Sequence, residues 1–385
     1  MLKEVIFFGG HIQALGLARQ TAALGLDVIL CVDDKCCVAR YSNSVKIVEY
    51  YKTPQQLCAI VEKYRSVDRH CLLFPTNDEM VVFLSQHYDD YLTGFCLGIP
   101  NPEIVNLFND KRLAYQFAEK NGIAAPKCWY PDSMSDVEKL SNDLPYPVVV
   151  KPAVMYSFHK AFGKKAFRCD SKEELISVYG WIDSYGYDLK KVLVQEFLSG
   201  GPTYLYSYAT FAADGDSKVS LMANRIRQNP MDFGNSTTFA ITCNVPEIRS
   251  AAEKILRVTN YFGLGEVEFM YDPYSKTYRF LEINTRAWKW HTISNQLDFS
   301  FIGAMIDYFN GTESFTAVEY RKVGWVERLT DWTVVTKEIL KGRLSIGDVA
   351  KSYRIKKEYA VWSKHDIIPF FMYVLLSPLL FFKRH

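Results

Sequence analysis

The stretch Leu281-Glu282-Ile283-Asn284-Thr285-Arg286 decides how the rest of this chain is interpreted. On an extended strand alternate side chains point to one face, so Glu282, Asn284 and Arg286 share a face. Oxygen ligands at this spacing suit Mg²⁺, which takes one or two carboxylates and completes its shell with water and phosphate. The arginine suits bidentate binding of a phosphate or carboxylate oxygen. Such a run often occurs by chance, so its meaning depends on a nucleotide pocket elsewhere in the chain.

Length and composition indicate a folded globular protein of two or three packed units. The 385 residues are 49% hydrophobic and 23% charged, which is the balance of a globular chain. The 45 basic and 43 acidic residues give a net charge of +2, so no overall field favours nucleic acid as a partner. The nine cysteines are scattered without CxxC or zinc spacing, and no signal peptide precedes the first apolar strand. We therefore expect reduced thiols and a cytoplasmic location.

The first hundred residues predict a doubly wound α/β unit. Buried strands are expected at Val5–Phe8 and Asp27–Val32, with a helix over residues 13–24 between them. A further strand, Cys71–Phe74, ends at Pro75-Thr76-Asn77-Asp78-Glu79, whose acidic residues suit the first turn of a helix. The glycines after the first strand do not have GxGxxG spacing, so no dinucleotide site is expected here.

Basic residues recur at the ends of predicted elements in the next part of the chain. Lys111 opens a helix that runs to about Lys120, and Lys151 lies at the end of the buried strand Tyr146–Pro152. Both lysines are point charges suited to phosphates. The polar loop 157–165 is expected to fold over a triphosphate. Its basic side chains are His159, Lys160, Lys164 and Lys165.

Two further patterns complete a predicted nucleotide and metal site. The run Gln195-Glu196-Phe197-Leu198 ends a predicted strand and is expected to hold an adenine edge through backbone groups. Glu268 and Glu282 are expected to face each other across a β-hairpin, with Asn284 just beyond. Two carboxylates and one amide would make a magnesium site that bridges ATP phosphates.

In the order of these motifs the chain resembles the ATP-grasp superfamily, and within it the carboxylate–amine ligases of the carbamoyl-phosphate-synthase type. The resemblance covers residues 3–310 and rests on Asp110-Lys111, Val150-Lys151-Pro152, the loop with Gly163, Gln195-Glu196-Phe197-Leu198, Glu268 and the run 282–286. It implies an α/β and α+β fold, with a Rossmann-like preATP-grasp domain followed by a two-lobed ATP-grasp fold. The implied domains are 1–108, 109–198, 199–312 and a C-terminal extension with an apolar tail, 313–385.

The resemblance also implies a role for each site residue. The residues implied are Lys111 and Lys151 for the ATP phosphates, Gln195, Glu196, Phe197 and Leu198 for adenine, and Glu268, Glu282 and Asn284 for Mg²⁺ or Mn²⁺. Arg286 would steady an acyl-phosphate. The family usually holds the ribose with an acidic residue shortly after the adenine-binding glutamate. Here that region reads Pro202-Thr203-Tyr204, so either Thr203 substitutes or another residue serves.

Two polar runs predict where the acceptor binds. Arg225 and Arg227 alternate with apolar residues on a predicted strand, which is expected to turn both guanidinium groups to one side. There they would meet a carboxylate substrate or its acyl-phosphate. The run Gly234-Asn235-Ser236-Thr237-Thr238 is expected to bind the ammonium or carboxylate of an amino acid through its backbone groups.

The C-terminal part of the sequence becomes apolar after a mixed helical and basic region. Ile367 to Phe382 is sixteen almost wholly apolar residues with two prolines, followed by Lys383-Arg384-His385. This run is shorter than the ~20 residues that span a bilayer. Two interpretations stay open, a helix packed on the core and a peripheral membrane contact through residues 367–385 on the cytoplasmic face. Because leaving these apolar residues in water is costly, the peripheral membrane contact is slightly favoured over the packed helix.

The sequence thus predicts an ATP- and Mg²⁺-dependent ligase that activates a small carboxylate and joins it to a small amine. One alternative is a carboxylase-type ATP-grasp enzyme that uses bicarbonate, against which the lack of a biotin-carrier sequence argues. The other is a nucleotide-binding module without catalysis, against which Glu282, Asn284 and Arg286 argue. A homo-oligomer is also compatible with the sequence.

Overall fold

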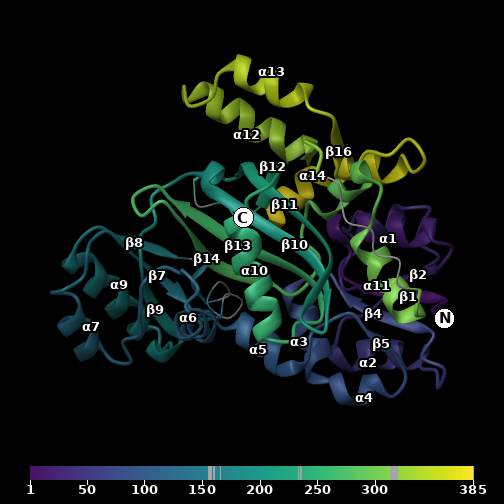
Figure 1. Cartoon of the computed structure of the whole chain (residues 1–385), viewed down its shortest axis with the longest axis horizontal. Coiled ribbons are helices and arrows are strands. Elements are labelled where there is room, and N and C mark those ends of the chain that lie inside the picture. The colour runs from purple at the N-terminus through teal and green to yellow at the C-terminus, as the bar shows by residue number, and fades with distance from the viewer. Residues whose placement is uncertain are drawn as a thin grey trace. The chain divides into compact units, whose positions relative to one another are not determined.

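The computed structural model describes residues 1–154, 158, 161–164, 166–232, 234, 236–312 and 320–384, without the side chains of 380–384. Figure 1 traces the chain and names its helices and strands. The chain forms two compact units. The first unit comprises Met1–Val105, Gly201–Val267 and Asn284–His385, and the second comprises Asn106–Gly200 and Glu268–Ile283.

The first unit opens with a parallel sheet in the order β3-β2-β1-β4-β5. Its strands are β1 (Glu4–Phe8), β2 (Asp27–Val32), β3 (Ile47–Tyr50), β4 (Cys71–Pro75) and β5 (Cys96–Leu97). The helices are α1 (Ile12–Ala23), α2 (Pro54–Glu62), α3 (Asp78–Gln86) and α4 (Tyr88–Leu92). Val5 and Phe7 pack in one core with α1, whereas Ile6 and Phe8 pack in another with α2, α3 and α4. Both faces of the sheet are covered, which explains the continuous apolar run of β1 and confirms the doubly wound prediction.

Two loops of this sheet meet where the order of its strands reverses, between β1 and β4. Gly9 follows β1 with a φ of 101°, and a Cβ there would lie 2.5 Å from Thr76 Oγ1. The Thr76 hydroxyl donates a hydrogen bond to the Phe8 carbonyl (2.7 Å), and Asn77 caps α3 by accepting from the Met80 N–H (2.9 Å). These contacts fix the start of α3, where the acidic residues predicted for a first turn stand.

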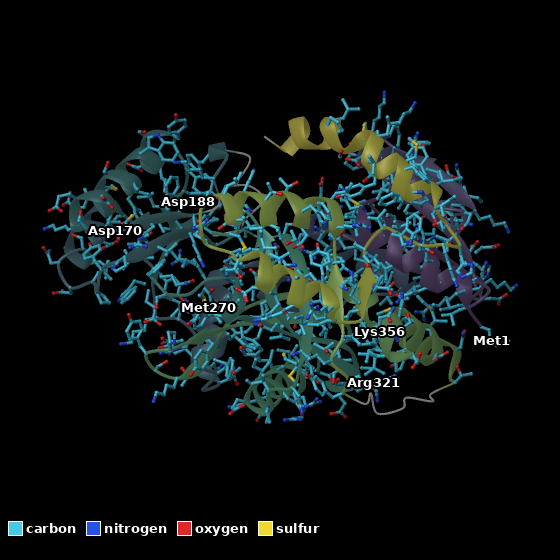
Figure 2. All side chains as sticks on the ribbon, turned by 90° about the horizontal axis from the view of Figure 1, so that it is seen from above. Met1, Asp170, Asp188, Met270, Arg321 and Lys356 are labelled. Carbon is cyan, nitrogen blue, oxygen red and sulfur yellow. The ribbon has the colours of Figure 1, made fainter. Side chains whose placement is uncertain are left out.

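A second sheet has the strand order β14-β13-β10-β11-β12-β15-β16. Its strands are β10 (Leu205–Ala213), β11 (Asp216–Asn229), β12 (Ser236–Cys243), β13 (Gly263–Asp272), β14 (Thr277–Asn284), β15 (Gly324–Val326) and β16 (Lys357–Tyr359). The helices α10 (Pro246–Val258) and α11 (Phe301–Asn310) accompany them. The strands β15 and β16 come from the C-terminal part of the chain, where β15 pairs with β12 antiparallel and β16 pairs with β15 in parallel. Gly324 at the start of β15 donates to the carbonyl of Lys356 (2.8 Å), which Figure 2 labels.

The second unit holds a four-stranded antiparallel sheet in the order β6-β9-β7-β8. Its elements are α5 (Pro102–Asn109), which begins in the first unit, α6 (Lys111–Lys120), β6 (Cys128–Trp129), α7 (Met134–Leu140), β7 (Val148–Pro152), β8 (Phe167–Cys169), α9 (Lys172–Ser184) and β9 (Val192–Glu196). Val150 and Val194 pair across the sheet and share a core with Tyr179 of α9. This core leaves Lys151, the next residue of β7, on the other side of the strand.

The C-terminal part adds α12 (Arg328–Leu340), α13 (Ile346–Arg354) and α14 (Ile368–Arg384) to the first unit. The apolar run of the sequence forms α14, which buries Tyr373 and Leu376 on one side. The interpretation of a helix packed on the core is therefore confirmed for one side of α14, and the peripheral membrane contact stays a prediction. In the part of the chain that the structure describes, no helix has the length and apolarity needed to cross a bilayer.

Candidate active site

The two lysines predicted to bind phosphate stand at neighbouring ends of elements in the second unit. Asp110 caps α6 by accepting hydrogen bonds from two backbone N–H groups of its first turn. The backbone N–H of Lys111 donates to the carbonyl of Ala153, just past β7 (2.9 Å). This bond brings the start of α6, with Lys111, next to the end of β7, with Lys151.

Lys111, Lys151 and Glu282 form a small charged cluster. The Lys111 ammonium donates to the Glu282 carboxylate. Burial and the positive charge of Lys111 lower the pKa of Lys151 to about 8, and Glu282 opposes this shift. Phosphate oxygens beside Lys151 would supply negative charge and raise its pKa again. The cluster therefore fits a nucleotide phosphate.

Gln195 positions Lys151 from the neighbouring strand β9. Its side-chain oxygen accepts hydrogen bonds from Lys151 Nζ (3.2 Å) and from the hydroxyl of Tyr115 (3.1 Å). The Gln195 side chain is buried, and its hydrogen bond orients the Lys151 ammonium. A contact between Gln195 and adenine stays a prediction.

The rest of the predicted adenine segment carries a buried acceptor. Among the described residues, Oε1 of Glu196 has no hydrogen-bond partner although it is buried. A buried acceptor without a donor is costly, so this position fits a ligand that brings an N–H or O–H group. The Phe197 ring lies 4.5 Å from the guanidinium of Arg168, and Leu198 is half-buried.

The predicted metal ligand Asn284 has its amide orientation set by a buried carboxylate, Glu266. Asn284 Nδ2 donates to Glu266 Oε2 (3.0 Å), and the indole N–H of Trp290 donates to Glu266 Oε1 (2.9 Å). Glu266 is 3% exposed. Because Glu266 holds the amide nitrogen, the Asn284 oxygen is turned away from it, and Arg286 donates to that oxygen (3.3 Å). An oxygen presented in this way is the ligand type that Mg²⁺ takes.

The donor set of the predicted metal site suits Mg²⁺. Glu268 on β13 is buried, and Glu282 on β14 is balanced by Lys111. Across the described ranges no group of three His, Cys, Asp or Glu side chains is arranged to hold a metal. The predicted set has only two carboxylates, which with one amide oxygen leaves coordination positions for water and phosphate. Their roles as ligands stay predictions.

Arg286 is held by Asp78 at the start of α3. Arg286 Nε lies 2.5 Å from Asp78 Oδ1, and Nη2 lies 3.2 Å from Oδ2, so two nitrogens face two oxygens. The Arg286 side chain is 17% exposed, whereas that of Asp78 is 66% exposed. A substrate carboxylate offers the guanidinium the same two oxygens as Asp78 does. The acidic run after β4 was the sequence signal for Asp78, but nothing in it indicated Arg286 as partner.

Arg227 corrects the expectation for β11. Its guanidinium donates to both carboxylate oxygens of Asp331 in α12 (2.8 Å each), and both residues are fully buried. The register against β12 shifts here, so Arg225 and Arg227 pair with the consecutive residues Ala240 and Phe239. This bulge breaks the alternation and puts the two arginines on opposite faces of the strand. The prediction that Arg227 meets substrate is therefore wrong, and its role is structural.

Lys289 is a cation that the sequence analysis did not assign to the site. Lys289 Nζ donates to Ser236 Oγ (3.0 Å) and lies 3.9 Å from a carboxylate oxygen of Glu327. Arg225 donates to the side chain of Gln228 (3.2 Å), at the same end of the β11–β12 ladder as Ser236. Gln228 pairs with Thr237, the residue next to Ser236. Between two tryptophans, Lys289 had no sequence signal that distinguished it from core packing.

Other predicted contacts take different roles or are not described. His159, Lys160, Lys165 and Asn235 lie outside the described residues. Lys164 Nζ lies 5.1 Å from the centre of the Phe167 ring. Thr238 is buried and its hydroxyl donates to Asp331 (2.8 Å), while binding of an amino acid by the backbone of this run stays a prediction. Thr203 is exposed and its carbonyl accepts from Asn224 (2.9 Å), while its ribose contact stays a prediction.

Comparison with known proteins decides the family. Residues 110–298 match the family described as carbamoyl-phosphate synthase L chain, ATP binding domain. This segment of the chain is an ATP-grasp domain. The matched ATP-grasp segment begins at the cap of α6 and ends beyond Arg286, so it contains the predicted phosphate, adenine and metal residues.

The relatives of this chain include ligases. It is 25% identical to D-aspartate ligase of Enterococcus faecium over 299 residues, which cover 73% of this chain and 70% of that one. Its fold is similar to N5-carboxyaminoimidazole synthetase from Staphylococcus aureus, with a TM-score of 0.67, 14% identity and coverage of 88% and 86%. It is also similar to the biotin carboxylase domain of Hydrogenobacter thermophilus 2-oxoglutarate carboxylase, a dimer in complex with MgADP, ADP and bicarbonate. That likeness has a TM-score of 0.64, 14% identity and coverage of 83% and 71%.

These findings confirm the predicted family and the predicted fold, a Rossmann-like unit followed by an ATP-grasp fold. The class of ATP-dependent carboxylate–amine ligases is confirmed at the level of the family. At 14% identity the solved structures show the fold alone. The division into four domains stays a prediction.

Proposed function

We propose that this protein activates an amino-acid carboxylate as an acyl-phosphate and joins it to an amine, releasing ADP and phosphate. The cluster of Lys111, Lys151 and Glu282 carries the proposal, because burial and like charge leave Lys151 with a pKa of about 8. A lysine in that state is stabilised by an incoming phosphate. The similarity to D-aspartate ligase over 73% of the chain supports an amino acid as the carboxylate substrate.

The first step transfers the γ-phosphoryl group of ATP to the carboxylate. A carboxylate oxygen bonds to the γ-phosphorus, and the bond from that phosphorus to the leaving oxygen of ADP breaks. Lys111 and Lys151 offset the charge on the phosphate oxygens, while Arg286 exchanges Asp78 for the substrate carboxylate and orients it. Glu268, Glu282 and Asn284 would hold Mg²⁺, which when bound supplies positive charge that offsets the charge of the phosphates. Positioning and charge neutralisation carry most of such a transfer.

The second step forms the amide. The amine nitrogen attacks the acyl carbon, the carbon–oxygen bond to phosphate breaks, and the nitrogen gives up a proton to the departing phosphate or to water. Arg225 and Lys289, at one end of the β11–β12 ladder, place positive charge beside Ser236 and Gln228. We assign this end to the substrate groups that do not react, such as a second carboxylate.

Hydroxylamine trapping tests the reaction. The purified chain would be incubated with ATP, Mg²⁺ and a panel of D- and L-amino acids, with hydroxylamine as the amine. We expect an amino acid to be required for ADP formation, with one hydroxamate formed for each ADP. ADP formation that needs only bicarbonate would favour the carboxylase alternative. Tight ATP binding without turnover for any combination of amino acid and amine would favour a nucleotide-binding module.

The proposal extends to the metal and to the setting of the enzyme. Mg²⁺ is the expected ion, and Mn²⁺ suits the same oxygen ligands. We place the enzyme in the cytoplasm, where ATP is available and its nine cysteines, all free, stay reduced. The dimer of the H. thermophilus domain supports the expectation of a homo-oligomer, which light scattering on the eluting protein tests.

A further inference from the structure

The helix α14 presents a broad apolar face to solvent. Its exposed side chains are Ile368 (55%), Phe371 (60%), Val374 (43%), Leu375 (68%) and Leu379 (54%). At about 100° per residue they lie within an arc of roughly 140°. Tyr373 and Leu376 on the other side are only 6% and 8% exposed, so the helix packs on the protein through one side. Figure 2 shows the helix in yellow.

This apolar face is fixed in place by Asp366, two residues before α14. Arg19 of α1 donates to Asp366 (2.9 Å), and so do the Ser42 hydroxyl (2.6 Å) and the Asn43 backbone N–H (3.1 Å). Asp366 is 5% exposed, so its charge is satisfied by these partners in the interior. The start of α14 is therefore anchored to the parallel-sheet part of the first unit. The exposed apolar side therefore belongs to a helix whose start is fixed to the rest of the unit.

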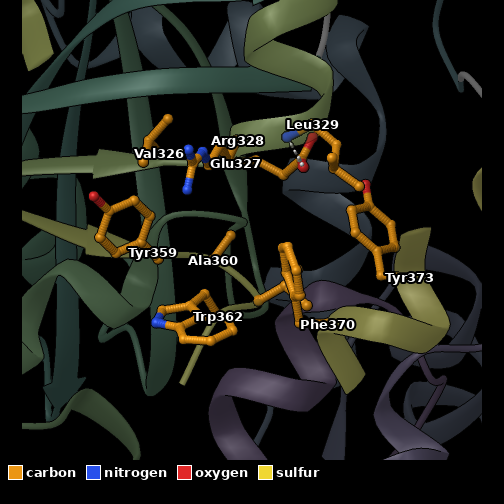
Figure 3. Close-up of a pocket in the computed structure, with 10 residues that line it drawn as sticks. Val326, Glu327, Arg328, Leu329, Tyr359, Ala360, Trp362, Phe370 and Tyr373 are labelled. Atoms are coloured by element: carbon orange, nitrogen blue, oxygen red, sulfur yellow. Dashed lines mark hydrogen bonds between the residues drawn. The ribbon is translucent and has the colours of Figure 1, made fainter. Parts of the chain in front are cut away.

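Aromatic residues border the face without forming a ligand pocket. Trp362 is 45% exposed and its ring meets that of Phe370 edge to face, with 5.2 Å between centroids. Figure 3 shows both rings beside Tyr373 around a small cavity. The cavity holds about 10 Å³, room for no more than one water. This cavity is too small for a small-molecule ligand. The exposed side of the helix is broad enough to contact an extended surface.

The sequence on either side of the apolar run is basic. Lys364 is exposed, and Lys383 and Arg384 follow the apolar run in the sequence. From residue 359 to 385 the sole acidic residue is Asp366, which is paired with Arg19. A two-fold contact between copies would bring like charges together around its axis. Anionic lipid headgroups attract them instead.

We propose that α14 docks the protein on a membrane surface rich in anionic lipid. The helix lies in the plane of the surface, with Phe371, Leu375 and Leu379 inserted among the headgroups. Trp362 sits at the level of the headgroups, where amphipathic aromatic rings are favoured. This docking does not depend on which carboxylate and amine the enzyme uses.

Flotation of the full chain with lipid vesicles tests the docking. Vesicles of phosphatidylcholine with phosphatidylglycerol would be compared with vesicles of phosphatidylcholine alone. We expect at least tenfold more protein bound to the anionic vesicles, and loss of that binding in 1 M NaCl. The double variant Phe371→Glu/Leu375→Glu should bind at least tenfold less. The matched control Leu340→Glu/Ile346→Glu changes two other exposed apolar residues, at 82% and 74% exposure, and should bind as the wild type does.

Each outcome bears on the docking proposal. Wild-type protein that stays with neither vesicle overturns it, as does equal loss of binding in the two double variants. A wild-type dimer that Phe371→Glu/Leu375→Glu dissociates, without vesicle binding, assigns the face to a second copy and also overturns it. The thermal midpoint of each variant checks that α14 is still folded. The salt dependence of the wild type tests the charge argument without any variant.

Discussion

At the scale of the residue, the charge of Glu282 links the predicted metal site to Lys111. Glu282→Gln keeps the size of the side chain but removes the charged partner of Lys111 and a predicted carboxylate ligand of the metal. We expect ADP formation to fall by at least about 100-fold, because charge stabilisation of the transferring phosphoryl group is lost. The rate should be measured with saturating ATP and a reactive amino acid. Glu247→Gln, on the exposed side of α10, is the control and should keep full activity. Full activity of Glu282→Gln would remove Glu282 from the site.

Glu266 is a positioning residue for Asn284, and its replacement should affect the metal more than the nucleotide. Glu266→Gln keeps the shape of the side chain but removes its charge. The glutamine amide can turn either its oxygen or its NH₂ group toward Asn284 Nδ2. Outer partners of metal ligands typically contribute about 10–100-fold in metal affinity. We expect the Mg²⁺ concentration for half-maximal activity to rise by about that factor, with near wild-type turnover at saturating Mg²⁺. A lower melting temperature with an unchanged Mg²⁺ requirement would make Glu266 merely structural.

Single residues were predictable where their position on an element defines their role. Lys111 follows a helix cap and Lys151 ends an apolar strand, and both patterns are local in sequence. Glu266 and Asp78 gain their roles from Asn284 and from Arg286, and these contacts join distant parts of the chain. No local pattern contains such a pairing. The spacing of Glu266 two residues before Glu268 was its only sequence signal.

At the scale of the element, β11 shows where strand alternation fails as a guide. Period-two reasoning put Arg225 and Arg227 on one face, and the register shifts of the β11–β12 ladder put them on opposite faces. A bulge depends on the partner strand, so the sequence of one strand does not reveal it. The short strands β15 and β16 were missed for a related reason, since three residues are too few to show a pattern.

The buried pair of Arg227 and Asp331 should hold α12 and α13 on the sheet. Thr238 and Tyr353 also donate to Asp331, so its carboxylate has four hydrogen-bond contacts in the interior. Asp331→Asn leaves the guanidinium of Arg227 buried without its counter-charge, and breaking such a pair costs about 3–5 kcal/mol. We expect urea unfolding to show a loss of this size.

Two companion variants make this stability prediction specific. Asp27→Asn removes an exposed pair with Lys46 and should cost less than about 1 kcal/mol. Replacing both buried partners, with Arg227→Met and Asp331→Leu, should cost less than Asp331→Asn alone because no charge is then left unpaired. A double variant that is less stable than Asp331→Asn would show that the pair contributes more than it costs in desolvation.

At the scale of the whole molecule, the first unit is assembled from segments far apart in the sequence. Arg19 in α1 and Asp366 before α14 are joined by an ion pair (2.9 Å), and Gln13 in α1 contacts His291 beyond the metal motif. The order of motifs predicted the family and the fold. It did not predict that the C-terminal part joins the N-terminal sheet, because Arg19 and Asp366 carry no local sign of each other.

His291 makes the stability of this assembly depend on pH. Its Nε2 lies 3.1 Å from the Gln13 carbonyl, and burial lowers the pKa of the ring to about 4, although that hydrogen bond opposes the shift. The folded state therefore favours neutral His291 more than the unfolded state does, where the pKa is about 6.5. This stabilisation is complete above pH 6.5 and is lost as the pH falls toward 4, by at most about 3 kcal/mol.

His291→Gln keeps an N–H donor for Gln13 and cannot be charged. Urea unfolding of this variant should depend less on pH between 6.5 and 4, whereas His365→Gln, at an exposed histidine, should follow the wild type. Parallel pH curves for His291→Gln and the wild type would place the acid sensitivity in other groups.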